Sequence, residues 1–339
     1  MKTVCLALLL AGSLLASTPA RGRGAAVAVA PAQAAASPVL IGAGDIGDCP
    51  LKNGKYRPAG TKAEATAKLV ESLLPPDPAA GVVFIAGDNA YFQGTRQQYE
   101  QCYGPTWGRF KDRTRPVPGN HEYIRDNRPQ AAWFARDYFD YFGEARAGRR
   151  SEGFYSYDLG GWHVVALNSE LRDTASFKPF TKQLKWLKED LTQNQRRCTL
   201  AYWHRPLFTS GEHGFNSPTP GVEPTMRAVW RALDEMGVDV VVNGHDHNYE
   251  RFNPQDADGN ADPNGVVEFV VGTGGTGLRE LAIAPANRRN SAAFDRLSYG
   301  VLRLTLHPDS YEFEFHTAAT DQPGHVFRDK SQAPVPCVD

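Results

Sequence analysis

Residues of the kinds that bind metal ions follow four short apolar segments of the sequence. Asp45, Asp88, His204 and His245 each stand within three residues of the end of such a segment. Carboxylate oxygens and imidazole nitrogens are common ligands of zinc, iron and manganese ions. Because ligand sites in α/β sheets lie outside the carboxyl ends of the strands, these distant residues are predicted to meet in one site.

Five short motifs contain these residues and several further polar ones. In chain order they are Gly44-Asp45-Ile46-Gly47, Gly87-Asp88-Asn89-Ala90-Tyr91, Gly119-Asn120-His121-Glu122, Trp203-His204 and Gly244-His245-Asp246-His247. Taken alone, a Gly-Asp pair is usually a turn or a helix cap, and a single tyrosine is usually a packed ring. The joint occurrence of all five motifs in this order favours a metal site over these separate explanations.

Apolar patterning predicts the elements that must position the motifs. Thr61–Leu74 is typical of a helix, with Thr61 as N-cap and Glu64 three residues later. Continuous apolar runs at 39–43 and 82–86, on either side of this helix, are typical of buried parallel strands. Further strands are expected at 115–118, 199–203, 238–242, 266–271 and 301–315, a hairpin around Gly160-Gly161, and helices at 181–195 and 223–236. This alternation predicts an α/β protein.

Together the motifs resemble the calcineurin-like metallophosphoesterase superfamily. Tyr91, three residues after Asp88, is similar to the purple acid phosphatases, and Glu212-His213-Gly214 is most similar to their short, tartrate-resistant type. The fold implied by this resemblance is α/β, a four-layer αββα sandwich of the metallophosphoesterase type, with mixed sheets and helices on the outer faces. No low-complexity linker interrupts residues 38–325, so we expect a single domain over residues 37–339.

The resemblance also implies which residues hold which metal ions. Asp88 matches the family's bridging position, because the two oxygens of a carboxylate can serve both ions. A first ion, Fe³⁺, would be held by Asp45, Asp88, Tyr91 and His247, since phenolate and carboxylate oxygens suit it. A second ion, Zn²⁺, Fe²⁺ or Mn²⁺, would be held by Asp88, Asn120, His204 and His245.

The activity implied is the hydrolysis of small phosphomonoesters by in-line attack of a metal-bound hydroxide. His121 would stabilise charge on the phosphoryl oxygens, and His213 would protonate the leaving oxygen. Glu212, in the same expected loop between Phe208 and Asn216, is the second candidate for the proton donor or for the group that orients it. A phosphodiesterase or nucleotidase of the same superfamily is the nearest alternative, because two metals serve diesters equally well. A non-catalytic, metal-loaded binding protein is a further alternative, against which the presence of every expected ligand argues.

The N-terminus is typical of an export signal. Lys2 precedes the apolar run Leu6–Leu15, which is too short to span a bilayer, and small residues continue to Ala36. We therefore expect residues 1–36 to be a signal peptide and Ala-rich leader. The mature protein is expected to be secreted or periplasmic and to have no membrane span.

Four cysteines remain after the expected leader, an even number that suggests disulfides in an exported protein. Cys49, Cys102, Cys198 and Cys337 allow three pairings. We favour Cys49–Cys102 with Cys198–Cys337; four free thiols are the alternative.

Composition excludes several other classes of protein. The 339 residues are 41% hydrophobic and 22% charged, with a net charge of -1, which excludes wholesale disorder, collagen and coiled coil. This nearly neutral net charge gives no indication of a nucleic-acid-binding surface, because such a surface usually needs a clustered basic face. Residues 256–262 resemble the start of a Ca²⁺ loop but lack its final glutamate, and residues 272–277 are glycine-rich. We expect an Asx- and Gly-rich hairpin at the first segment, before the strand at Val266, and a tight turn near the metal site at the second.

Overall fold

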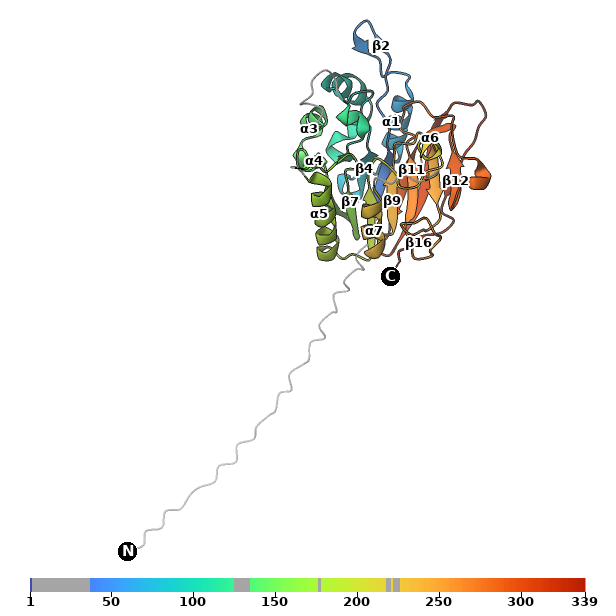
Figure 1. Ribbon diagram of the computed structural model, residues 1–339. Coiled ribbons are helices and arrows are strands. Elements are labelled where there is room, and N and C mark those ends of the chain that lie inside the picture. Colours follow the sequence, from blue (N-terminus) through green and yellow to red (C-terminus); the bar gives the residue numbers. More distant parts are fainter. Residues whose placement is uncertain (2–36, 125–134, 176–177, 218–220, 222–225, 339) are drawn as a thin grey trace, which may run out of the picture. The chain divides into compact units, whose positions relative to one another are not determined.

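Two mixed β-sheets form the centre of the fold in the computed structural model (Figure 1). The structure describes residue 1 and residues 37–124, 135–175, 178–217, 221 and 226–338. The expected leader and the start of the helix expected at 223–236 lie outside the described residues. Ala36–Asp339 form one compact unit by their internal contacts.

The first sheet contains the N-terminal strand–helix–strand unit. Its strand order is β15-β14-β13-β1-β4-β5, and β16 also pairs with β14. The strands are β1 (Val39–Ala43), β4 (Gly81–Ala86), β5 (Thr114–Val117), β13 (Ser298–Leu306), β14 (Ser310–Thr320), β15 (Asp329–Lys330) and β16 (Val335–Pro336). β1, β4 and β5 are parallel, so their carboxyl ends meet at one edge of the sheet.

The second sheet has the order β12-β10-β11-β9-β8-β7-β6. Its strands are β6 (Tyr155–Leu159), β7 (Trp162–Ala166), β8 (Cys198–Tyr202), β9 (Val240–Asn243), β10 (Tyr249–Phe252), β11 (Val267–Val271) and β12 (Ser291–Asp295). β7, β8, β9 and β11 are parallel, and their carboxyl ends also share one edge. A separate hairpin joins β2 (Leu51–Lys52) to β3 (Lys55–Tyr56).

Helices and short helical turns connect the strands. The α-helices are α1 (Lys62–Leu73), α2 (Arg96–Gln98), α3 (Arg136–Phe142), α4 (Glu144–Ala147), α5 (Pro179–Gln193), α6 (Glu212–Asn216) and α7 (Arg227–Glu235). The 3₁₀-helices are η1 (Pro78–Ala80), η3 (Trp107–Arg113), η4 (Asn120–Tyr123) and η7 (Pro285–Asn287), and η2 (Tyr99–Tyr103) is a short π-helix.

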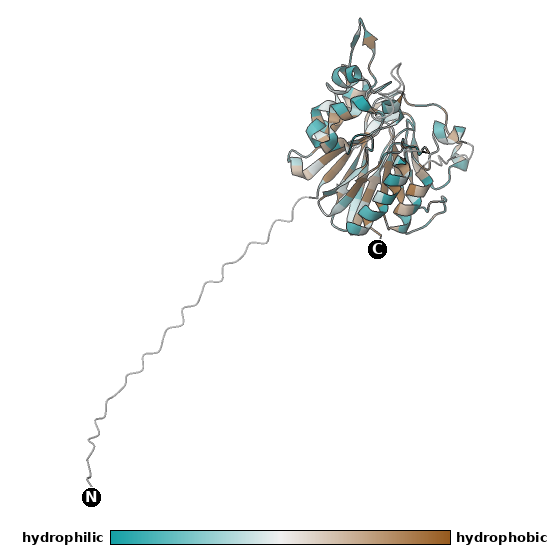
Figure 2. Cartoon of the chain, turned by 60° about the vertical axis from the view of Figure 1, so that its left-hand side comes forward, coloured by the Kyte–Doolittle hydropathy of each residue, from teal (hydrophilic) through white to brown (hydrophobic). Residues whose placement is uncertain are grey.

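Two hydrophobic cores separate the layers of the fold. One core lies between the sheets and joins side chains such as Leu302 of β13 to Leu200 of β8 and Val242 of β9. The other joins the opposite face of the second sheet, including Ala201, to the buried sides of α5 and α7. In Figure 2 the hydrophobic residues concentrate in the strands. With α1 packed on β13 and β14 of the first sheet, this arrangement is the predicted four-layer αββα sandwich.

Several local expectations can be compared with the described elements. α1 starts where the capping pattern predicted, because the Glu64 N–H donates to the Thr61 hydroxyl at 3.2 Å. The apolar run 301–315 is divided between β13 and β14, which turn around Pro308. The loop expected around Glu212 and His213 is wrong, since these residues start helix α6, which is too short to show an apolar period. The hairpin expected at 256–262 is confirmed: Gln255 forms an antiparallel bridge with Ala261, and Asp256 accepts backbone N–H groups of Asp258 and Asn260 at 2.9 and 2.8 Å.

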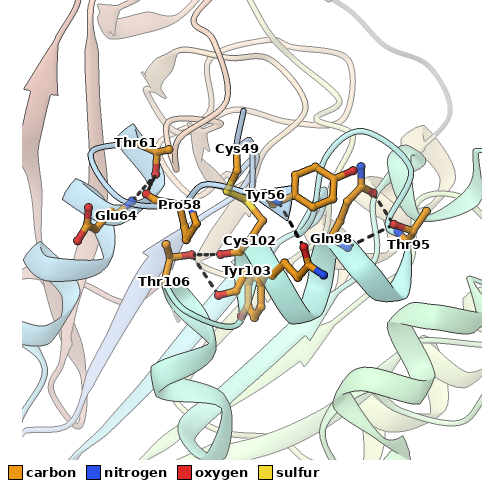
Figure 3. The surroundings of a disulfide bond; sticks show 11 residues. Cys49, Tyr56, Pro58, Thr61, Glu64, Thr95, Gln98, Cys102, Tyr103 and Thr106 are labelled. Carbon is orange, nitrogen blue, oxygen red and sulfur yellow. Dashed lines mark hydrogen bonds between the residues drawn. A yellow bond between two sulfur atoms is a disulfide. The ribbon is translucent and has the colours of Figure 1, made fainter. Parts of the chain in front are cut away.

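Two disulfides confirm the favoured pairing of the cysteines. Cys49 is bonded to Cys102 and Cys198 to Cys337. The first bond ties the segment after β1 to η2, which follows β4 along the chain (Figure 3). It therefore links two loops that leave the edge where the metal motifs lie. Among the described residues, none of the helices has the length and apolarity needed to cross a membrane.

Candidate metal centre

Four side chains from the ends of β1, β4 and β9 converge on one buried point. The Tyr91 hydroxyl oxygen lies 2.7 Å from Asp45 Oδ1, 2.9 Å from Asp88 Oδ2 and 3.2 Å from His247 Nε2. His247 Nε2 is also 3.2 Å from Asp45 Oδ1. All four residues are buried. They are the four residues predicted to hold the first metal ion.

A second group of donors surrounds His204 Nε2. This nitrogen lies 3.0 Å from Asn120 Oδ1, 3.1 Å from His245 Nδ1 and 3.3 Å from Asp88 Oδ2. Asp88 Oδ2 therefore belongs to both groups, as a bridging carboxylate would. The structure brings all seven predicted ligand residues together from the ends of β1, β4, β5, β8 and β9.

Hydrogen bonds from the backbone leave one oxygen of each carboxylate facing the centre. Asp45 Oδ2 accepts the His245 backbone N–H at 2.8 Å, and Asp88 Oδ1 accepts the His121 backbone N–H at 2.8 Å. The oxygens that remain are the ones that meet Tyr91 and the imidazoles. The carboxylates are thus oriented by the main chain of the neighbouring ligand loops.

Two of the three histidines are oriented by backbone carbonyls. His204 Nδ1 lies 2.9 Å from the Ala86 carbonyl oxygen, and His247 Nδ1 lies 2.7 Å from the Gly277 carbonyl oxygen. Donation from Nδ1 to a carbonyl leaves the Nε2 lone pair for a metal ion. Gly277 ends the glycine-rich segment 272–277, so the tight turn expected near the site lies beside His247.

The backbone of the ligand loops is strained. Asp45, Asp88 and His245 have φ angles of 61°, 50° and 69°, in the left-handed region. Such conformations in residues other than glycine cost roughly 1–3 kcal/mol each and cluster at functional sites. A Cβ atom on Gly119 would lie 2.2 Å from Asp88 Oδ1, and one on Gly244 would lie 2.7 Å from Asp45 Oδ2. These motif glycines allow the backbone to pass close to the carboxylates.

The electrostatics of the cluster favour cations. Burial raises the pKa of Asp45, but the charges of His247 and His204 outweigh it, and the pKa is lowered. Burial lowers the pKa of His204, but the charge of Asp88 and its hydrogen bond outweigh this effect and raise it to about 9. The carboxylates therefore draw positive charge to a site with exposed fractions of 0% for Asp45 and 1% for Asp88.

The donor chemistry fits two metal ions. One set contains two carboxylates, a phenol and an imidazole, and the other contains a carboxylate, an amide and two imidazoles. Burial and the charges of Asp45 and Asp88 raise the pKa of Tyr91 well above its usual value. A cation at this point would therefore be needed for the phenol to act as a phenolate ligand. A second cluster of this kind among the described residues, Cys198, Asp239 and Cys337, contains a disulfide and is not a comparable donor set.

His121 lies between the ligands and solvent. Its Nε2 is 3.8 Å from Asp88 Oδ2, and its side chain is 19% exposed. Its Nδ1 lies 2.7 Å from the Phe92 carbonyl oxygen, so donation from Nδ1 leaves Nε2 directed toward the centre. This imidazole can reach a molecule that binds over the two donor sets.

His213 stacks on the candidate ligand His245. The ring centroids are 3.8 Å apart with 15° between the planes, and the His213 backbone N–H donates to Asp246 Oδ1 at 3.2 Å. His213 Nε2 is buried and has no hydrogen-bond partner among the described residues. Burial lowers the pKa of His213; Asp246 opposes this, and the charges of Arg279 and Arg205 add to it.

Glu212 has a different environment from His213. Its Oε1 lies 3.2 Å from Arg279 Nη1, and its side chain is 28% exposed. The structure thus pairs Glu212 with an arginine at the edge of the site, whereas His213 packs on the ring of the candidate ligand His245. Of the two candidates for proton donation, His213 has the geometry closer to the donor sets.

Sequence reasoning assigned no role to Glu122, although it named the motif that contains it. Glu122 accepts the backbone N–H groups of Asn89 at 2.9 Å and Gly119 at 2.7 Å, and the Tyr99 hydroxyl at 3.1 Å. It therefore joins the loops after β4 and β5, which supply Asp88 and Asn120. Burial, with a smaller effect from the charge of Asp88, raises the pKa of Glu122 to about 7. The one signal for Glu122 in the sequence was its position directly after His121 in the motif.

Comparison with known families covers the segment that contains every candidate ligand. Residues 40–249 match the calcineurin-like phosphoesterase family. The chain belongs to the calcineurin-like phosphoesterase family. All seven candidate ligand residues, together with His121, Glu212 and His213, lie inside the matched segment.

Curated relatives of the chain include plant purple acid phosphatases. The chain is 33% identical over 192 residues to purple acid phosphatase 15 of Arabidopsis thaliana, covering 53% of this chain and 34% of that protein. It is 29% identical over 241 residues to purple acid phosphatase 23 of the same plant, covering 62% and 49%. These relatives confirm the resemblance to purple acid phosphatases. The chain spans between a third and a half of the length of these two relatives.

A solved structure of the same group has the same fold. The purple acid phosphatase PPD1 from yellow lupin seeds matches with a TM-score of 0.65 at 20% sequence identity. The match covers 86% of this chain and 53% of the lupin chain. The predicted metallophosphoesterase fold is thereby confirmed.

Proposed function

We propose that this protein is an exported, binuclear metal-dependent phosphatase that hydrolyses phosphomonoesters. The observation that carries the proposal is the convergence of two donor sets that share Asp88 Oδ2. Fe³⁺ is proposed for the set with Tyr91, and Zn²⁺, Fe²⁺ or Mn²⁺ for the set with Asn120. Membership of the calcineurin-like phosphoesterase family supports the class of reaction.

Two bound metal ions would supply Lewis acidity toward a phosphoryl oxygen and a water activated near neutral pH. The residues around them then have separate tasks. His121 Nε2, directed over the donor sets, donates to a phosphoryl oxygen on which negative charge grows. His213 Nε2, buried and without a partner among the described residues, gives its proton to the leaving oxygen.

Glu212 has an orienting role in this proposal. Its contact with Arg279 holds the start of α6, and therefore the backbone next to His213. The preference for monoesters rests on the resemblance carried by Tyr91 and Glu212-His213. A phosphodiesterase with the same metal centre would lack a requirement for the doubly charged monoester.

Export is supported by the disulfides, which persist in oxidising compartments. Residues 1–36 are proposed to be removed as a signal peptide and leader, and residues 37–339 to form a single metallophosphoesterase domain. Secretion to the medium or the periplasm agrees equally with these observations.

The test is a comparison of two substrates on one purified preparation. We expect rapid hydrolysis of 4-nitrophenyl phosphate, slow hydrolysis of bis(4-nitrophenyl) phosphate, and loss of both in Asp88→Asn. Leu281→Ala is a suitable control, because Leu281 is 49% exposed and is not among the proposed ligands. Faster hydrolysis of the diester would favour the phosphodiesterase. A metal-loaded protein that hydrolyses neither would favour a binding protein and contradict the proposal.

A further inference from the structure

His245 differs from the other two candidate histidine ligands in the partner of its outward ring nitrogen, which is the nitrogen that faces away from the two donor sets. The outward nitrogens of His204 and His247 face backbone carbonyl oxygens. The outward nitrogen of His245 is Nε2, and it lies 2.9 Å from Nη1 of Arg205. Metal-binding histidines almost always donate this outer N–H to a carboxylate, a carbonyl or a water, so an arginine is an unusual partner.

The contact between Arg205 and His245 is incompatible with metal coordination by His245. A guanidinium has only donors, so His245 Nε2 must accept in this contact. His245 Nδ1 faces His204 Nε2 and the other donors of the second set. If Nδ1 gives its lone pair to a metal ion, the neutral ring carries its proton on Nε2. Two N–H donors would then face each other, and Arg205 must leave Nε2.

Arg205 is held at its Nε and its backbone N–H by groups other than His245. Its Nε lies 2.8 Å from Glu170 Oε1, and its backbone N–H donates to Ser169 Oγ at 3.1 Å. Glu170 also accepts the Ser169 hydroxyl at 3.1 Å. The side chain of Glu170 is 8% exposed and that of Arg205 is 21% exposed. A small rotation about the Glu170 contact would therefore carry Nη1 away from His245 without breaking the ion pair.

The space beside His245 is where a phosphate ester would bind in the proposed function. His213, the proposed proton donor to the leaving oxygen, stacks on the same imidazole with ring centroids 3.8 Å apart. Once it leaves Nε2, Arg205 needs an acceptor for Nη1. A phosphoryl oxygen offers one, and the planar guanidinium matches two such oxygens at once.

We propose that Arg205 binds the phosphoryl oxygens of substrate and phosphate product in the metal-loaded protein. Metal binding releases its guanidinium from His245 and makes it available for the anion. This inference rests on the proposed function, because it assumes a phosphate ester over the metal centre. Arg205 follows the candidate ligand His204 directly, so the same loop supplies one metal ligand and the anion-binding group.

The test uses Arg205→Gln in the full mature chain, with Arg109→Gln as the matched control. Arg109 also forms an arginine–glutamate pair, with Glu71 at 3.3 Å, but on α1 and η3. Calorimetric titration with inorganic phosphate is combined with metal analysis of each preparation. We expect Arg205→Gln to keep its metal ions and to bind phosphate roughly tenfold to a hundredfold more weakly than wild type. Arg109→Gln should match wild type.

Arg205→Lys separates the requirement for a positive charge from the requirement for the planar guanidinium group. Lysine keeps the charge but loses the two-pronged geometry, so we expect phosphate affinity between those of wild type and Arg205→Gln. Unchanged phosphate affinity in a metal-loaded Arg205→Gln would overturn the proposal. So would loss of metal in that variant, because Arg205 would then be a support for His245. A wild-type protein that holds metal but neither binds phosphate nor hydrolyses esters would instead contradict the proposed function.

Discussion

Replacing His213 by glutamine is expected to remove the proton donor and spare the metal centre. His213 is not one of the seven candidate ligands, and its Nε2 is the atom proposed to reach the leaving oxygen. Glutamine keeps a polar side chain at the second residue of α6. Phe215→Ala is the matched control, because Phe215 lies on the same helix and is 50% exposed.

The size of the effect should depend on the leaving group. General acid catalysis contributes roughly 10²–10⁴-fold, or about 3–5 kcal/mol of transition-state free energy. An alkoxide needs this proton in the transition state, so alkyl phosphates should lose the full factor. A nitrophenolate leaves without a proton, so 4-nitrophenyl phosphate should lose less than about tenfold.

The pH dependence gives a second signature. Burial, reinforced by the charges of Arg279 and Arg205, lowers the pKa of His213 from its usual value, and bound cations would act in the same direction. The acid form of His213 therefore predominates only at acidic pH. Turnover of alkyl phosphates by wild type should fall as pH rises through this lowered pKa, and the variant should lack that fall.

The assay is kcat/KM for a series of aryl and alkyl phosphates across acidic and neutral pH, with metal content measured on every sample. The reasoning predicts a steeper dependence on leaving-group basicity in His213→Gln than in wild type or Phe215→Ala. An equal loss for aryl and alkyl esters with full metal content would refute it. In that case His213 would position the substrate or the loop and would not donate the proton.

Three further predictions concern stability and the first metal ion. His163→Gln should lower the free energy of unfolding by about 2 kcal/mol at acidic pH, because the ring nitrogens of His163 lie 3.0 and 2.8 Å from two aspartates. Burial lowers the pKa of His163, but the two aspartates outweigh burial and raise the pKa. The stabilisation is therefore complete below the pKa of this histidine in the unfolded state and disappears as pH rises through its pKa in the folded state. Urea unfolding of wild type and variant at pH values below and above this range checks the prediction. Cys198→Ser opens a disulfide spanning 139 residues and should lower the free energy of unfolding by roughly 2–5 kcal/mol, measured against wild type under non-reducing conditions. Tyr91→Phe should abolish any visible absorption band of the iron-loaded protein, since the phenolate is the proposed charge donor; a band that persists would remove Tyr91 from the iron.

Four of the seven candidate ligands could be predicted to meet because they follow strand ends, whereas Tyr91, Asn120 and His247 came from the resemblance to a known family. Asp45 and Asp88 each stand two residues after a parallel strand, and the parallel pairing of β1 with β4 brings them to the same edge. His204 follows β8 by two residues, and His245 follows β9 by two. Strand prediction and a short distance from the strand ends were therefore sufficient to predict that these four residues meet in one site.

The residues that contact the candidate ligands could not be predicted in the same way. Arg205 meets His245 through a side-chain rotamer, across 40 positions of sequence, and no apolar pattern encodes that contact. Glu122 accepts hydrogen bonds from Asn89, Ala90, Tyr99 and Gly119, and its role depends on how η4 turns after β5. Helix α6 has five residues, fewer than two turns, so the sequence around His213 carries no helical period.

The central claim of this account is that two metal ions share Asp88. The most direct test is the metal content of purified wild type and of Asp88→Asn, prepared side by side and both shown to be folded by circular dichroism. The account predicts two ions per chain in wild type and loss of both in the variant, because each donor set loses its common carboxylate. A wild type that holds one ion or none after reconstitution, or a variant that keeps both, would contradict it.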